Sequence, residues 1–267
     1  MAAVVLTQPQ PRVRDIAELM TRHGGQPVLL TFSELIGRPE ALSRFASIDL
    51  AGFDRAVFVS PSSVDFAGPL LPALVQALPR GIAAVGAGTV ARLRAFAPDI
   101  EPIVPASEPY DAAALSALPA MSAQGMRGLL VLRGEQGRED WLQAYESRGV
   151  RVERIALYDT LRCTPGPDAV SGLQAAARSA QPAISLVTSV GLAQRLLAWL
   201  AEGPAEQIGA GPANLLCTWL REQTCLVSHP RVGGLLSDAG FVHVIQPGSG
   251  ESMSLAAVKW LTAFRPN

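Results

Sequence analysis

The 267-residue sequence is poor in cysteine, histidine and aromatic side chains, with three Cys, three His and 6% aromatic residues. Cys163, Cys217 and Cys225 are odd in number and lack paired close spacing, which argues against both a disulfide framework and a zinc site. We expect ordinary thiols. The histidines are scattered in the same way, and His243 lies inside an apolar segment where a packed imidazole is expected. The sequence therefore gives no support to metal chemistry.

The sequence also lacks an excess of charge of either sign, and it lacks long apolar runs. The 22 Lys and Arg residues nearly balance the 23 Asp and Glu residues, so no global field draws the chain to nucleic acid or to an anionic membrane. No apolar run is long enough to span a bilayer, and the first residues show no basic region followed by a cleavage site. We therefore predict a cytoplasmic protein. With 49% hydrophobic residues, it can bury one large core or two modest ones.

Short apolar runs alternate with amphipathic segments of about a dozen residues, which is typical of βαβ units and parallel sheets. A longer unit occurs twice. In the first copy a strand at 56–59 runs into Ser60-Pro61-Ser62-Ser63, and in the second a strand at 184–187 runs into Thr188-Ser189. Each copy then continues through a second strand, a polar turn, a helix and a third strand. The later strands are expected at 82–85 and 102–104 in one copy, and at 225–228 and 242–245 in the other.

A shorter strand–turn–helix–strand unit also occurs twice, at 4–31 and 127–157. Along the chain the order is short, long, short, long. Residues 53–158 can therefore form one complete five-stranded lobe, while the other lobe is discontinuous. This order requires the chain to cross between lobes twice, near 32–37 and 159–167.

The predicted fold class is α/β, with two flavodoxin-like doubly wound parallel sheets that bind ligands outside the carboxyl ends of their strands. Facing binding edges would make this a cleft protein. We place lobe 1 at 1–33 and 167–267, lobe 2 at 38–158, and the linker at 34–37 and 159–166. Residues 202–215 are rich in Gly and Ala and are left open as a loop or a broken helix.

Motifs along almost the whole chain resemble those of the uroporphyrinogen-III synthases. The matching segments are Thr7-Gln8-Pro9, 58–64, 84–89, Leu132-Arg133-Gly134, Gly137-Arg138, 157–160, 187–189 and 227–231. The resemblance implies two α/β lobes joined by a two-stranded linker. Two departures stand out: Gln8 replaces an Arg found in many members, whose role Arg12 or Arg14 could take, and His229-Pro230-Arg231 replaces a glycine turn.

The glycine turn of lobe 2, Gly86-Ala87-Gly88-Thr89-Val90-Ala91, fits the G-x-G-x-x-G/A dinucleotide-binding fingerprint and follows a strand. The strand after its helix ends in Pro105-Ala106, without the acidic residue that holds a ribose. We instead expect backbone N–H groups at Gly86, Gly88 and Thr89 to bind a substrate carboxylate. A purely structural turn is the alternative.

Hydroxyl side chains gather where strands of both lobes end. They are candidate substrate-binding groups: Thr7, Ser60, Ser62, Ser63, Thr188 and Ser189. The serines and Thr188 have an alternative role as helix N-caps. The sequence has no G-x-S-x-G elbow, which argues against hydrolase chemistry.

Three arginines are expected at the same strand ends. Arg133 and Arg138 flank the turn that contains Gly134, and Arg231 follows a strand of the other lobe. We predict that they bind carboxylates together with Gly134. The alternative is that they are solvated surface arginines.

Tyr158 lies where lobe 2 meets the linker, a position at which a tyrosine is often simply packed. The resemblance implies that it faces the cleft and acts as a general acid. A phenol with an ordinary pKa of about 10 is protonated at neutral pH and can donate to a leaving hydroxyl.

The resemblance implies a lyase that cyclises the linear tetrapyrrole hydroxymethylbilane with inversion of ring D, in porphyrin (heme) biosynthesis. It implies no cofactor and no metal, because the electron-rich pyrrole drives departure of the hydroxyl group. We expect a monomer. Two alternatives compete with this function: a two-lobed binding or sensor module for a small anionic ligand, and a nucleotide-sugar transferase, for which no nucleotide-binding carboxylate is found.

Overall fold

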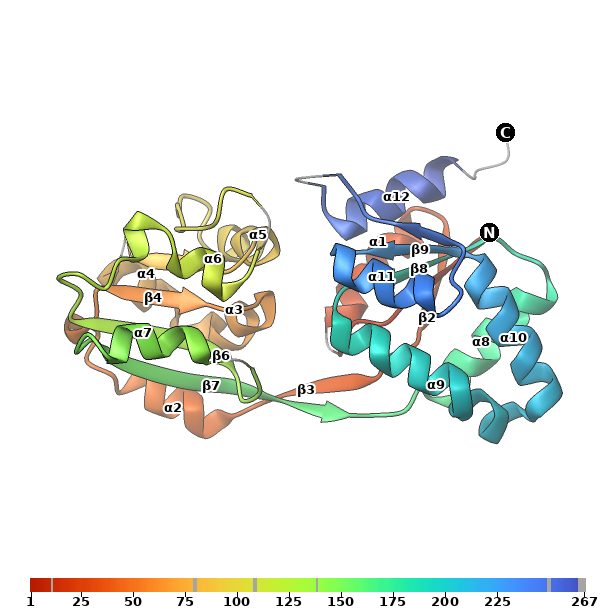
Figure 1. The fold of residues 1–267 in the computed structure, drawn as a ribbon, viewed down its shortest axis with the longest axis horizontal. Helices are drawn as coiled ribbons and strands as arrows, with labels where there is room; N and C mark the ends of the chain where they lie inside the picture. The colour runs from red at the N-terminus through yellow and green to blue at the C-terminus, as the bar shows by residue number, and fades with distance from the viewer. Residues whose placement is uncertain (11, 79–80, 108–109, 138, 249–250, 264–267) are drawn as a thin grey trace. The chain divides into compact units, whose positions relative to one another are not determined.

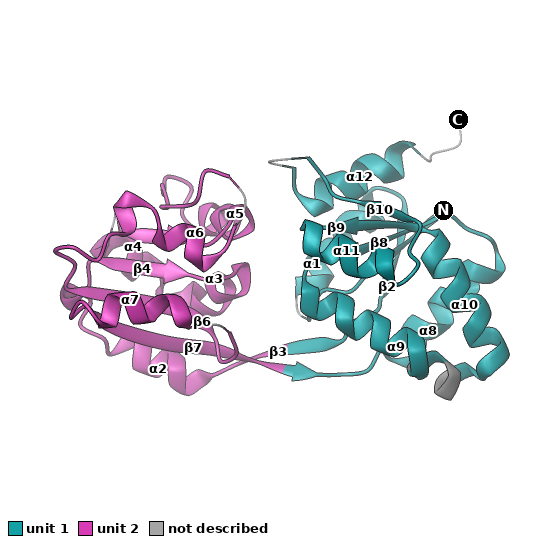
Figure 2. Ribbon diagram, in the orientation of Figure 1, with its two compact units in different colours: residues 1–34, 161–267 teal, residues 35–160 magenta. Residues whose placement is uncertain are grey.

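The computed structural model describes residues 1–10, 12–78, 81–107, 110–137, 139–248 and 251–263 (Figure 1). The chain divides into two compact units (Figure 2). Unit 1 comprises residues 1–34 and 161–267, and unit 2 comprises residues 35–160. No helix among the described residues is both long and apolar enough to cross a membrane.

The sheet of unit 1 has five parallel strands in the order β2-β1-β8-β9-β10. Their bounds are β1 Ala2–Leu6, β2 Gly25–Leu29, β8 Ala183–Val187, β9 Thr224–Val227 and β10 His243–Ile245. Numbered within the unit, this is the order 2-1-3-4-5 of a flavodoxin-like doubly wound sheet. The short unit supplies the first two strands, and the long unit supplies the other three.

Helices cover both faces of this sheet. Val4 and Leu6 of β1 join a cluster with α1 and α12, while Val5 joins a cluster with α8, α9, α10 and α11. This alternation follows from the two-residue period of a strand. The helices are α1 Arg12–Arg22, α8 Pro167–Arg178, α9 Val190–Ile208, α10 Ala210–Glu222, α11 Pro230–Asp238 and α12 Met253–Ala263.

The sheet of unit 2 has the order β3-β7-β6-β4-β5, and Ile103 adds a single parallel bridge beside β5. Its strands are β3 Ser33–Gly37, β4 Arg55–Phe58, β5 Ile82–Ala84, β6 Gly128–Gly134 and β7 Arg151–Arg162. Here the long unit comes first in the chain. The two sheets nevertheless have matching strand orders, because β7-β6-β4-β5 and Ile103 correspond to β2-β1-β8-β9-β10. The predicted fold class and repeat order are thus confirmed.

Apolar clusters also pack on both faces of the second sheet. Phe58, Leu130 and Leu132 lie in one cluster with α2 to α5, while Val57 and Val131 lie in the other with α6 and α7. The helices are α2 Pro39–Ala46, α3 Pro61–Ala67, α4 Leu71–Ala77, α5 Ala87–Phe96, α6 Ala112–Ser116 and α7 Gln143–Glu146.

The unit boundaries fall inside β3 and β7, which are neighbours in the sheet order. The Arg38 N–H donates to the Leu157 carbonyl at 2.9 Å, and the Cys163 N–H donates to the Phe32 carbonyl at 3.2 Å. From the first of these bonds to the second, the residue number falls on one strand and rises on the other, so the two strands run antiparallel. β3 includes residues 34–37 and β7 includes residues 159–162, which are parts of the linker predicted at 34–37 and 159–166.

Two local expectations are resolved by the structure. Residues 202–215 belong to α9 and α10, which are separated by Gly209. Gly209 has a φ of +83°, a backbone conformation that favours glycine.

The prediction that His243 is packed was wrong, because its side chain is exposed on β10. That strand ends the sheet order, so its apolar sequence does not imply burial on both faces.

The three thiols are free and differ in access to solvent. Cys163 is exposed, whereas Cys217 and Cys225 are buried. Burial raises the pKa of the Cys225 thiol to about 12, so at pH 8 only about one molecule in ten thousand carries the reactive thiolate there.

We therefore expect about one thiol per chain to react rapidly with a thiol reagent in native protein, and three in denaturant. The Cys163→Ser variant should lose the fast phase. Fast labelling of native Cys163→Ser would contradict the burial of Cys217 and Cys225.

Candidate active site

Tyr158 of β7 is held in a fixed position at the carboxyl edge of the unit 2 sheet. Only 8% of its surface is exposed. Its ring stacks on Phe66 of α3, with centroids 5.1 Å apart and an interplanar angle of 23°. Gly134 lies against the same ring, because a Cβ atom placed there would be 2.6 Å from Tyr158 Cε2. The ring is thus confined by α3 and β6.

The Tyr158 hydroxyl lies 3.0 Å from Ser60 Oγ, and either oxygen can be the donor. Ser60 is the N-cap of α3, and its Oγ accepts the Ser63 backbone N–H at 3.1 Å. The Ser60 N–H donates to Ser63 Oγ at 3.3 Å, which completes a capping box. Ser60 therefore connects the helix cap to the phenol.

A bulge between β6 and β7 brings Gly134 and Tyr158 together. Arg133 pairs with Ala156, but Gly134 pairs with Tyr158, so Leu157 is an extra residue on β7. The Glu135 N–H then donates to the Tyr158 carbonyl at 2.8 Å. Such bulges re-aim side chains at strand ends. At this position the site requires glycine for close approach to the ring.

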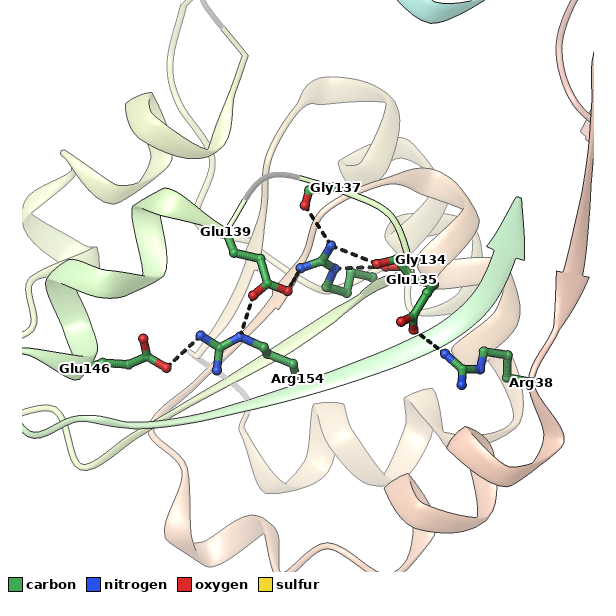
Figure 3. A network of polar contacts seen from close by, with 8 residues as sticks. Arg38, Gly134, Glu135, Gly137, Glu139, Glu146 and Arg154 are labelled. Carbon is green, nitrogen blue, oxygen red and sulfur yellow. Dashed lines mark hydrogen bonds and ion pairs between the residues drawn. The ribbon is translucent and has the colours of Figure 1, made fainter. Parts of the chain in front are cut away.

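Arg133 organises the loop after β6, whose residues Gly134, Glu135 and Gly137 are labelled in Figure 3. Its side chain is 6% exposed. The guanidinium donates to the carbonyls of Gly134 at 2.9 Å, Glu135 at 3.2 Å and Gly137 at 3.1 Å, and it also pairs with Glu139. Four of its five N–H donors are thereby used. The structure thus gives Arg133 an internal role, where the sequence analysis expected a direct substrate contact.

Ion pairs extend this network to β7. Arg154 lies 3.2 Å from Glu139 and 2.6 Å from Glu146 (Figure 3). A second pair joins Glu135 to Arg38, beyond the end of β3. Arg138, a predicted carboxylate contact, lies outside the described residues.

The N-terminus of α5 lies beside that of α3. Gly86 is its N-cap, and a Cβ atom at Gly88 would be 3.6 Å from Pro61. Thr89 is 3% exposed, and its N–H donates to the Gly86 carbonyl at 3.0 Å. Of the three residues predicted to bind a carboxylate here, Gly86 is half-buried, Gly88 is exposed and Thr89 is buried; Ala87, which was not predicted, is exposed beside Gly88 in the same first turn.

In unit 1 the helices that begin at the corresponding edge of the sheet, α9 and α11, are also capped. Ser189 Oγ accepts the Leu192 N–H at 3.2 Å, and Ser228 donates to the Thr188 carbonyl at 2.8 Å. His229 is the N-cap of α11, and its Nδ1 accepts the Arg231 N–H at 3.1 Å. Thr188 is half-buried, and Ser189 and Arg231 are exposed.

Other predicted contacts have side chains turned into the protein. Thr7 is fully buried and donates to the Leu186 carbonyl at 2.7 Å. Ser62 and Ser63 are 6% and 0% exposed. Gln8 is 5% exposed, and its Nε2 lies 3.5 Å from the Leu186 carbonyl. These contacts favour a structural role, which the sequence analysis had weighed for the serines.

Within unit 2, the structure brings together Ser60, Gly134 and Tyr158, all singled out from sequence. Phe66 could not be singled out from the sequence, because nothing in an amphipathic helix marks the residue that stacks on a tyrosine 92 positions away. The hydrogen bond from Ser228 to the Thr188 carbonyl was not predicted either. A hydroxyl directly after a strand was the available signal there.

Comparison with known families identifies the fold and its relatives. The family model described as uroporphyrinogen-III synthase HemD matches residues 14–256. A mutant uroporphyrinogen III synthase from Thermus thermophilus is 16% identical, with a TM-score of 0.52 and 98% of each chain covered. Uroporphyrinogen-III synthetase from Helicobacter pylori is 12% identical, with a TM-score of 0.48, covering 99% of this chain and 100% of that one. None of the curated protein sequences matches.

The structural likeness supports the two-lobed α/β fold, and the family match extends over nearly the whole sequence. The chain therefore belongs to the uroporphyrinogen-III synthase family, which comprises cyclising hydro-lyases of tetrapyrrole biosynthesis.

Proposed function

We propose that this chain converts hydroxymethylbilane into uroporphyrinogen III, with loss of water and inversion of ring D. The observation that carries the proposal is the family match over residues 14–256. That match supports the synthase and gives no support to a binding module without enzymatic activity. The hydroxyl pair of Tyr158 and Ser60 at a strand-end edge is consistent with it.

In this reaction the protein has two main tasks, which are to transfer a proton and to position the substrate. The pyrrole nitrogen expels the terminal hydroxyl group, and a proton from Tyr158 Oη lets it leave as water. The resulting azafulvene cation is attacked by the substituted carbon of ring D, which gives a spiro intermediate. Fragmentation and closure at the other carbon follow, and the ring proton finally lost can return to the phenolate. The substrate supplies the electron push throughout.

The eight carboxylates of the substrate require hydrogen-bond donors. In unit 2 we assign this role to the exposed first turn of α5, at Ala87 and Gly88. In unit 1 we assign it to Thr188, Ser189 and Arg231. Direct contacts from Thr7, Ser62, Ser63 and Arg133 remain predictions that their burial disfavours.

The test is the identity of the porphyrin formed. Freshly generated hydroxymethylbilane is incubated with the protein, and the product is oxidised and separated by chromatography. We expect type III isomer to predominate. Type I isomer alone, at the rate seen with heat-denatured protein, would overturn the proposal.

The monomeric state and the cytoplasmic location stay predictions. Size-exclusion chromatography at several protein concentrations tests the monomeric state.

A further inference from the structure

We infer that Ser60 is a positioning residue that donates its hydroxyl hydrogen to Tyr158 Oη and so leaves the phenol proton directed at the substrate. The inference rests on the proposed function, because it deepens the role given there to Tyr158. Its basis is the 3.0 Å contact between the two oxygens.

The tyrosine ring has little freedom of its own. Phe66 stacks on one side at a centroid distance of 5.1 Å, and Gly134 lies within close contact of Cε2 and Cζ. With the ring fixed, the remaining variable is rotation about the bond from Cζ to Oη, which sets where the proton points. A neighbouring donor at Ser60 can select that direction.

The cap fixes the serine in turn. Ser60 Oγ accepts the Ser63 N–H at 3.1 Å, and the Ser63 hydroxyl donates to the Ser60 carbonyl at 2.6 Å. One lone pair of Ser60 Oγ is thus occupied by a backbone donor, which leaves its hydrogen and its second lone pair for other partners. Tyr158 Oη lies at hydrogen-bond distance to receive the hydrogen.

This direction of donation suits an acid that must release a proton. When the Tyr158 proton moves to the leaving hydroxyl oxygen, the C–O bond breaks and water departs. Oη then carries a negative charge, and the bond from Ser60 becomes charge-assisted. The Ser63 N–H polarises the Ser60 hydroxyl and strengthens it further. If Tyr158 donated to Ser60 instead, the proton would be unavailable to the substrate.

The experiment combines Ser60→Ala with Tyr158→Phe. In the parent protein, Ser60→Ala should lower kcat about 10-fold, while Ser60→Thr, which keeps both a hydroxyl and a cap, should restore most of the activity. In the Tyr158→Phe background, Ser60→Ala should cause no further loss, since it acts through the phenol. Ser252→Ala is the matched control for capping, because Ser252 Oγ accepts the Leu255 N–H at 3.2 Å and lies outside the proposed site.

A second readout does not require turnover. The chain has three tyrosines, so the NMR signal of ζ-¹³C-labelled Tyr158 can be assigned by its loss in Tyr158→Phe. Ser60→Ala should raise the pKa of Tyr158, because the phenolate loses a donor. Ser252→Ala should leave it unchanged.

The outcomes separate the inference from the proposed function. Equal losses from Ser60→Ala in both backgrounds, with an unchanged Tyr158 titration, would reduce Ser60 to a helix cap and overturn the inference alone. Full activity of Tyr158→Phe would remove the acid role and the inference with it. A protein without synthase activity would fail the isomer assay, and the titration would still decide whether Ser60 donates.

Discussion

Tyr158→Phe should form uroporphyrinogen III about 100-fold more slowly than the parent protein. General acid catalysis contributes on the order of 10²- to 10⁴-fold, and we expect the lower end because the pyrrole itself drives departure of the hydroxyl group. The phenylalanine ring keeps its place between Phe66 and Gly134, so the loss should lie mainly in kcat. Initial rates with fresh hydroxymethylbilane measure the effect.

A stability measurement distinguishes this from general damage. Losing the hydrogen bond to Ser60 should lower the free energy of unfolding by only about 1 kcal/mol. The fraction of type I isomer should rise, because uncatalysed cyclisation then competes with the slowed enzyme. A folded Tyr158→Phe with parental kcat and isomer ratio would remove the phenol from the mechanism.

The fold was predictable because its signals are local and repeated. Apolar runs mark the strands around Val4, Val57, Val131 and Ile184, and matched turns reveal two kinds of repeated unit. Their order along the chain then requires one lobe to be discontinuous, and the two sheets show that order. The wrong prediction for His243 arose because an edge strand and a central strand can have the same apolar composition. Only the central strand is buried on both faces, and composition alone does not show which of the two a segment forms.

The site was only partly predictable, because a residue type does not state its partner. Arg133 after a strand suggested a carboxylate contact, but its side chain turns inward to bind three carbonyls and Glu139. The sequence is compatible with Ser60 as a helix cap or as a substrate contact, and in the structure it is a cap that also contacts Tyr158. The contact with Tyr158 joins residues 98 positions apart, so no local sequence pattern predicts it.

Gly134→Ala should impair both stability and activity through a single steric contact. The new methyl group would lie 2.6 Å from Tyr158 Cε2 and 2.8 Å from Cζ, closer than carbon atoms can approach. Either the ring must move away from Ser60 or the bulge must open. Overpacking of this kind costs about 1–3 kcal/mol of unfolding free energy, and a displaced phenol should lower kcat at least about 10-fold.

Gly234→Ala serves as the matched control. Gly234 lies in α11, and a Cβ atom there meets nothing within 4 Å, so alanine should stabilise the helix by about 0.5–1 kcal/mol and leave kcat unchanged. In the Tyr158→Phe background, Gly134→Ala should still destabilise, because phenylalanine presents the same ring carbons. It should cause little further loss of kcat there, since no phenol remains to be displaced. A large additional loss in that background would show that Gly134 serves catalysis by some route other than the tyrosine.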